Sequence, residues 1–178
     1  MNKPYKIILT AMFAALTAVG AFIRIPVGVS SFTMQFFFTA LAGLLLPPAY
    51  AALSQAVYIV LGIAGLPIFT SGGGIGSVMS TTFGFVAALP LTAFVISMIV
   101  RKNISFLRAA LACVCGLAVL YAVGLPYMGA VLNLYMNKNY TVSGVIAAGM
   151  LPFLPFDAAK IVLAALIAPR IRKLIRKD

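Results

Sequence analysis

The chain contains no histidine, no tryptophan and no glutamate. Its only acidic residues are Asp157 and Asp178. Its two cysteines are Cys113 and Cys115. A structural zinc site or a histidine-based catalytic triad therefore has no parts from which to be built. General acid–base chemistry would depend on Asp157 and Lys160. We accordingly expect no metal site, no resident cofactor and no enzyme activity.

The chain is rich in apolar residues: 63% of its 178 residues are apolar and 8% are charged. This composition is typical of an integral membrane protein. The net charge of +11 raises the possibility of a nucleic-acid partner. The basic residues, however, lie in short runs between apolar segments, with no aromatic-interleaved polar face on which bases could stack. The sequence therefore predicts contact with the lipid bilayer and no nucleic-acid binding.

Six apolar segments follow one another, at 5–23, 32–46, 49–66, 78–100, 109–134 and 145–168. We predict a single all-α membrane domain, residues 1–178, built as a bundle of six transmembrane helices. The second segment would rise only about 22 Å, against a hydrocarbon core of about 30 Å. The preceding loop is therefore expected to dip below the outer surface and to line a recess.

The basic residues predict the orientation of this bundle, because lysine and arginine beside the membrane ends favour the cytoplasmic side. Ten of the 13 fall on one face under the six-helix topology: Lys3, Lys6, Arg101, Lys102, Arg108, Arg170, Arg172, Lys173, Arg176 and Lys177. Pro47 and Pro48 mark a tight turn on that same side. We therefore place both termini in the cytoplasm of a plasma-membrane protein.

Asp157 and Lys160 stand three residues apart in the otherwise uncharged stretch 151–169. On a helix this spacing puts both charges on one face. Charges at bilayer depth are costly, and they usually mark a functional site that faces a cavity or the bundle interior. The alternative is a neutralised ion pair with only a structural role. We predict a substrate-binding site in the outer third of the membrane, with one acceptor beside one donor for a small polar ligand.

Two further patches fall at the same outer end. The first, IRIPVGVSSFTMQ, carries Arg24 and Gln35. Arg24 is a candidate ligand contact, and the alternative is a side chain that extends to the headgroups. Gln35 needs a hydrogen-bond partner one turn into an apolar helix, and that partner is either the ligand or another helix.

The second patch, LPIFTSGGGIGS, places Gly72, Gly73, Gly74 and Ser77 in a loop whose backbone can approach a ligand closely. A flexible surface loop would look similar. Nucleotide binding is excluded, because no soluble strand precedes the glycines and no Gly-Lys-Ser/Thr ending follows them. Asn133 and Tyr135 are minor substrate-binding candidates at the outer end of the fifth segment, where amphipathic residues are common in any case.

Small residues recur along the first segment, with Ala11 and Ala15 forming one pair and Ala14 and Ala18 another. This spacing allows a second helix to approach closely. It predicts either a docking face for a partner membrane protein or internal packing within the bundle.

In these features the chain resembles the S components of energy-coupling factor (ECF) vitamin transporters, and within them the biotin-specific BioY family. The likeness covers nearly the whole chain. It rests on the alanine-rich first helix, the Arg-Ile-Pro loop with its following Gln35, the triple-glycine loop, and the Pro-Phe-Asp-x-x-Lys motif that carries Asp157 and Lys160.

The resemblance implies a six-helix, high-affinity biotin-binding subunit that captures biotin from outside. It also implies docking on a transmembrane coupling protein with two cytoplasmic ATPases, with Ala11 and Ala15 at that contact. Asp157 and Lys160 are the implied ligand contacts. Biotin suits such residues, because its ureido group has two N–H donors and one carbonyl acceptor. Lys160 could instead meet the carboxylate of the ligand.

The competing interpretation is an autonomous secondary transporter of a small polar solute, with Asp157 as its proton carrier. The inverted repeat common in such transporters is not visible here. The short second segment and the charged sixth segment have no symmetric counterparts.

Overall fold

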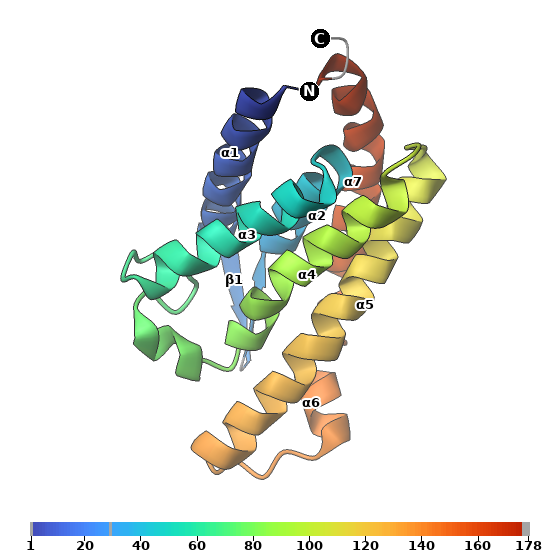
Figure 1. Cartoon of the computed structure of the whole chain (residues 1–178). Helices are drawn as coiled ribbons and strands as arrows, with labels where there is room; N and C mark the ends of the chain where they lie inside the picture. Colours follow the sequence, from blue (N-terminus) through green and yellow to red (C-terminus); the bar gives the residue numbers. More distant parts are fainter. Residues whose placement is uncertain (1, 29, 176–178) are drawn as a thin grey trace.

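The computed structural model describes residues 2–28 and 30–175, and its elements are helices apart from one two-stranded hairpin (Figure 1). The helices are α1 (Lys3–Phe22), α2 (Gln35–Leu45), α3 (Pro48–Ile63), α4 (Phe83–Val100), α5 (Phe106–Ala130), α6 (Val142–Gly149) and α7 (Leu154–Ile175), with a 3₁₀ turn η1 (Ile75–Met79) and a π-helical turn η2 (Val131–Tyr135). Strands β1 (Arg24–Val27) and β2 (Ser30–Thr33) pair antiparallel. The predicted all-α class is confirmed.

Helix α2 lies at the centre of the bundle and contacts α1, α3, α4 and α7. Nine of its 11 residues are buried. Gly43 allows the close approach of α4, since a Cβ at this position would lie 2.8 Å from the Ile96 side chain. The helix is only about 16 Å long, so it is shorter than the hydrocarbon core, as predicted from the sequence.

Within residues 2–28 and 30–175, three helices are long and apolar enough to cross a membrane: α1, α4 and the continuous 30-residue helix Phe106–Tyr135. A fourth span results if α6 and α7, which are bent by 49° relative to each other, count as one. Helices α2 and α3 are shorter apolar helices. Length and composition of the described residues therefore support three or four spans, and the expected six crossings are not established by these criteria.

The sixth apolar segment differs from its prediction as one continuous helix over 145–168. The structure breaks it between Gly149 and Leu154. Pro152 lies in this break and Pro155 occupies the first turn of α7. Proline lacks the amide hydrogen that a helix interior requires, and its ring displaces the preceding turn. The two prolines therefore account for a new helix beginning just before Asp157.

Most of the described basic residues belong to segments at one end of the molecule: Lys3, Lys6, Arg101, Lys102, Arg108, Arg170, Arg172 and Lys173. Both ends of the described chain, the α2–α3 turn and the α4–α5 connection lie at the top of Figure 1, whereas the hairpin and α6 lie away from that end. The Arg172 guanidinium joins two of these segments, because it donates hydrogen bonds to the carbonyls of Val100 (2.7 Å) and Arg101 (3.1 Å). Arg176 and Lys177 lie outside the described residues.

Candidate functional site

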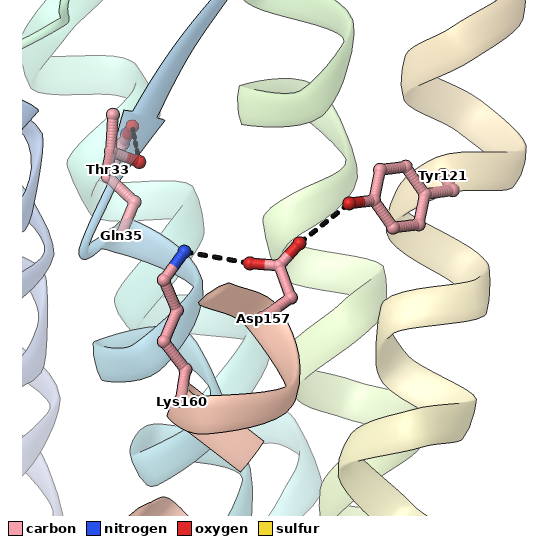
Figure 2. Close-up of polar contacts among 5 residues, drawn as sticks. All are labelled: Thr33, Gln35, Tyr121, Asp157 and Lys160. Atoms are coloured by element: carbon pink, nitrogen blue, oxygen red, sulfur yellow. Dashed lines mark hydrogen bonds and ion pairs between the residues drawn. The ribbon is translucent and has the colours of Figure 1, made fainter. Parts of the chain in front are cut away.

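The centre of the site is a buried ion pair at the start of α7 (Figure 2). Lys160 Nζ lies 2.8 Å from Asp157 Oδ1, and both residues are 5% exposed. The second carboxylate oxygen, Oδ2, accepts a hydrogen bond from the Tyr121 hydroxyl of α5 at 2.6 Å. Each carboxylate oxygen therefore has its own donor, which is the condition for burying a charge at tolerable cost.

The position of Asp157 in the first turn of α7 also favours its charge. The N-terminal end of a helix carries a partial positive charge that stabilises a nearby anion. This position depends on the break at Pro152, which lies inside the apolar segment 145–168 predicted from the sequence. The structure therefore supplies a stabilising contribution that a continuous helix would not have provided.

The Lys160 ammonium has a second neighbour in the hairpin. It lies 4.2 Å from the centroid of the Phe32 ring, which belongs to β2. Phe32 also packs against Phe156, with ring centroids 4.8 Å apart. A cation over an aromatic face is attracted by the ring quadrupole, more strongly when the pair is desolvated. The hairpin thus covers the ion pair with aromatic surface.

Gln35, the first residue of α2, links the hairpin to α3. Its Oε1 accepts from the Thr33 hydroxyl at 3.1 Å, and its Nε2 donates to the Tyr58 hydroxyl at 2.8 Å. Tyr58 in turn donates to the Ile68 carbonyl at 3.0 Å. The amide therefore has the interhelical partner that one of the two sequence interpretations required, and it still borders the cavity described next.

These side chains line a cavity of about 80 Å³. The lining comes from the hairpin, α2, the segment 70–82, α4, α5 and the α6–α7 region: Ser30, Ser31, Phe32, Thr33, Gln35, Phe36, Thr70, Thr82, Phe85, Val86, Leu89, Leu120, Tyr121, Gly149, Phe153, Asp157 and Lys160. Pockets for small organic ligands usually measure about 300–1,000 Å³. A ligand of that class therefore requires the surrounding loops to move apart.

Two loops that contribute to this lining are joined by Arg24. Its guanidinium donates to the Thr70 carbonyl and so ties the start of β1 to the segment 64–82. Gly72 and Gly74 have φ values of +101° and +85°, which favour glycine. The Gly72 amide donates to Phe69 O within the loop, and the Gly74 amide donates to Gly62 O near the end of α3. The glycines therefore shape a compact loop here.

The structure brings together three of the predicted substrate-binding residues, Asp157, Lys160 and Gln35, on the wall of one cavity. The others do not line it: Arg24, Gly72, Gly73, Gly74 and Ser77 belong to the β1 and 64–82 segments, and Asn133 and Tyr135 to η2. Asn133 bonds the backbone of Tyr140 at both its amide atoms, and Tyr135 is 63% exposed. Whether any of these residues contacts a ligand stays a prediction.

The residues missing from the predicted site are chiefly Tyr121 and the hairpin residues 30–33. Tyr121 was recognisable in principle, because the buried positions of α5 include Leu117, Tyr121, Gly124 and Met128 and so follow helical spacing. This periodicity places Tyr121 on the inner face, whereas Tyr135 lies beyond the regular α-helix. The hairpin residues carry no comparable signal, since serine and threonine next to glycine are typical of any loop.

The alanines predicted to form a docking face divide into two sets. Ala11 and Ala15 are exposed on the surface of α1. Ala14 is 5% exposed and belongs to the bundle core, and Ala18 packs partly against that core. The first pair therefore remains available to a partner, and the second pair serves internal packing.

Known proteins match this chain along almost its whole length. The model of the BioY family matches residues 1–177. A Lysinibacillus sphaericus protein, named probable biotin transporter BioY, is 40% identical over 172 residues, which cover 96% of this chain and 88% of the relative. The biotin transporter BioY of Thermotoga maritima is 39% identical over 170 residues, covering 95% and 96%. A crystal structure of the S component for biotin from an ECF-type ABC transporter shares the fold, with a TM-score of 0.84 at 23% identity, covering 97% of this chain and 95% of that one.

Proposed function

This chain belongs to the BioY family, and from that premise we propose that it is the biotin-binding membrane subunit, or S component, of an ECF-type vitamin transporter. The observation that carries this proposal is the match to the family over residues 1–177, with relatives named biotin transporters. The protein is accordingly a transport protein and not an enzyme.

The chemistry of the cavity supports a ligand with the functional groups of biotin. An Asp157 oxygen can accept from a ureido N–H, and Lys160 can donate to the ureido carbonyl or to the ligand carboxylate. The Tyr121 hydroxyl adds a donor that already reaches Asp157. Phe32, Phe85 and other apolar side chains of the lining would bury the fused rings, as in most small-molecule sites.

Binding requires the cavity to enlarge, since its present volume is about 80 Å³. The hairpin and the segment 64–82 are the elements to move, because they contribute loop residues to the lining and are tied to each other through Arg24 and Thr70. Displacing them outward would separate Phe32 from Lys160 and free the ammonium for the ligand.

The distribution of basic residues favours one orientation of the protein in the membrane, with both termini on the cytoplasmic side. We infer six crossings with both termini in the cytoplasm of a plasma-membrane protein, because the basic clusters share one end of the bundle. The ligand site, near the start of α7, then opens toward the outside. The partners are a transmembrane coupling protein, which docks against Ala11 and Ala15, and two cytoplasmic ATPases.

Calorimetric titration of the purified protein with biotin tests this function. We expect wild-type protein to bind biotin, and Asp157→Asn and Lys160→Ala each to weaken binding at least about tenfold, or 1.4 kcal/mol. Either change leaves one buried charge without its partner. Lys138→Ala, which removes an exposed lysine outside the cavity, is the matched control.

Unchanged affinity in both site variants would remove Asp157 and Lys160 from the ligand site. Absence of binding by the wild-type protein would contradict the proposed function as a whole. Uptake by the protein alone in liposomes, driven by a pH gradient, would favour the autonomous transporter instead.

A further inference from the structure

A second cavity, of about 800 Å³, lies at the end of the bundle where the basic residues gather. Its lining comprises Lys6 of α1, Arg101 and Arg172, the turn 44–50 between α2 and α3, and part of α4 around Phe94 and Met98. None of these residues borders the ion-pair cavity. In the sequence, these basic residues predict only the orientation of the chain in the membrane.

Three cations face this space, and no acidic residue of the described chain lines it. Arg172 is 6% exposed and is held by the carbonyls of Val100 and Arg101. Lys6 Nζ lies 5.6 Å from the centroid of the Tyr50 ring, and Arg101 is exposed at the end of α4. Like charges in a concave, low-dielectric site concentrate a positive potential. The cavity therefore favours an anion.

The first turn of α3 adds to this potential. This helix of 16 residues begins at Pro48, and no side chain caps its first turn. The cavity is lined by the residue before this helix and by its first three residues: Pro47, Pro48, Ala49 and Tyr50. The N-terminal end of a helix carries a partial positive charge, which favours a phosphate group. Pro47 and Pro48 themselves have no amide hydrogen, so this contribution comes from the helix dipole and the amides that follow them.

The remaining lining is apolar and opens on the outer surface of α4. Phe94 and Met98 are 39% and 48% exposed, on a helix that is itself long and apolar enough to span a membrane. An anion with an attached hydrocarbon chain fits this arrangement better than a free inorganic ion. Basic pockets between transmembrane helices are known to hold lipid headgroups.

We propose that this cavity binds the phosphate headgroup of an anionic phospholipid, with Lys6, Arg101 and Arg172 around the phosphate and an acyl chain along Phe94 and Met98. The proposal depends on the protein lying in a membrane and is independent of its cargo.

Native mass spectrometry of the full-length protein, titrated in detergent with phosphatidylglycerol, tests the proposal. The double variant Lys6→Gln/Arg101→Gln should weaken phosphatidylglycerol binding at least about tenfold. The matched control is Lys102→Gln/Lys173→Gln, which removes the same charge from exposed positions at the same end that do not line the cavity. The control should change binding by less than about twofold. Arg172 is left unchanged, because its guanidinium also donates hydrogen bonds to the carbonyls of Val100 and Arg101.

Parallel titrations with phosphatidylcholine and with inorganic phosphate separate the sources of the phosphate group. Weaker retention of phosphatidylcholine, and no competition by millimolar phosphate, would support a lipid headgroup site. Equal loss of binding in both double variants would show that lipid binding depends on the overall surface charge and not on this cavity, and it would overturn the proposal. Displacement of the lipid by inorganic phosphate at similar concentrations would overturn it too, because the site would then recognise the free ion.

Discussion

The Asp157 carboxylate lies in an apolar helix because each of its oxygens has a donor from a different residue. Lys160 supplies one and Tyr121 the other, at 2.8 Å and 2.6 Å. An ion pair of this kind contributes little to stability compared with well-packed apolar residues. Its presence in so apolar a chain is better explained by a function that needs both charges, such as ligand binding.

The Tyr121 hydroxyl is expected to contribute to the affinity of this site for biotin. Tyr121→Phe removes a hydrogen bond to a charged group, an interaction that contributes about 1.5–3 kcal/mol, so we expect biotin affinity to fall about tenfold. Tyr135→Phe removes the same hydroxyl from an exposed residue outside the cavity and should leave affinity unchanged. Calorimetry on both variants checks this. Equal affinities of Tyr121→Phe and wild-type protein would show that the hydroxyl has no part in binding.

At the residue scale, the sequence was most informative where a residue was out of place. Asp157 and Lys160 could be predicted because a charge in an apolar stretch demands an explanation. Phe32 could not be assigned to the site, because aromatic residues are common throughout an apolar chain and only the packing of the hairpin against α7 brings it to the ion pair. Helical spacing places Tyr121 on the inner face of α5, but the contact with Asp157 follows only from the packing of α5 against α7.

Among the elements, α1, α2 and α3 are joined by a buried polar cluster around Gln55. Its Oε1 accepts from Thr39 of α2 at 2.9 Å and from Thr17 of α1 at 3.2 Å. Its Nε2 donates to Ser54 at 3.0 Å. Interhelical hydrogen bonds of this kind fix the packing of helices whose apolar surfaces alone would not select one arrangement.

Two buried threonines test the contribution of this cluster. Thr39 and Thr92 are both 0% exposed, but only Thr39 donates to Gln55, whereas the Thr92 hydroxyl has no partner among the described residues. Thr39→Val should lower the free energy of unfolding by roughly 0.6–1.7 kcal/mol. Thr92→Val should be neutral or stabilising, since it removes an unsatisfied polar group. Unfolding titrations in mixed detergent micelles measure both, and equal losses would contradict this role for the cluster.

Element boundaries were less predictable than element existence. The apolar segments located the helices, and the short second helix was predicted correctly. The break at Pro152 was missed because hydropathy does not change across it. The β-hairpin was missed because its strands have only four residues each, too few for an alternating pattern to stand out from an irregular loop.

For the whole molecule, the exposed small residues of α1 offer the clearest surface for a partner helix. Ala11→Trp and Ala15→Trp should each reduce co-purification of the coupling protein at least about tenfold, because a bulky side chain prevents close helix approach. Biotin affinity should be unchanged, since neither residue lines the cavity. Ala87→Trp, at an exposed alanine of α4, controls for the bulk of the indole. Wild-type yields of the partner with both α1 variants would place the docking surface elsewhere.

Membership of the BioY family was predicted from motifs that lie far apart in the chain, and it is confirmed over residues 1–177. The membrane character was predicted from composition, and the helical class was predicted from the apolar segments. The size of the cavity did not follow from any pattern, because it depends on how closely the hairpin and the segment 64–82 pack over the ion pair.

The pairing of one carboxylate with one ammonium has an electrical consequence. Moving a net elementary charge across a membrane potential changes the energy by about 2.3 kcal/mol per 100 mV. The Asp157–Lys160 couple sums to zero, so a shift of α7 along the membrane normal transfers no net charge from these two groups. Any voltage dependence of uptake that arises at this site should then reflect the valence of the carried molecule itself.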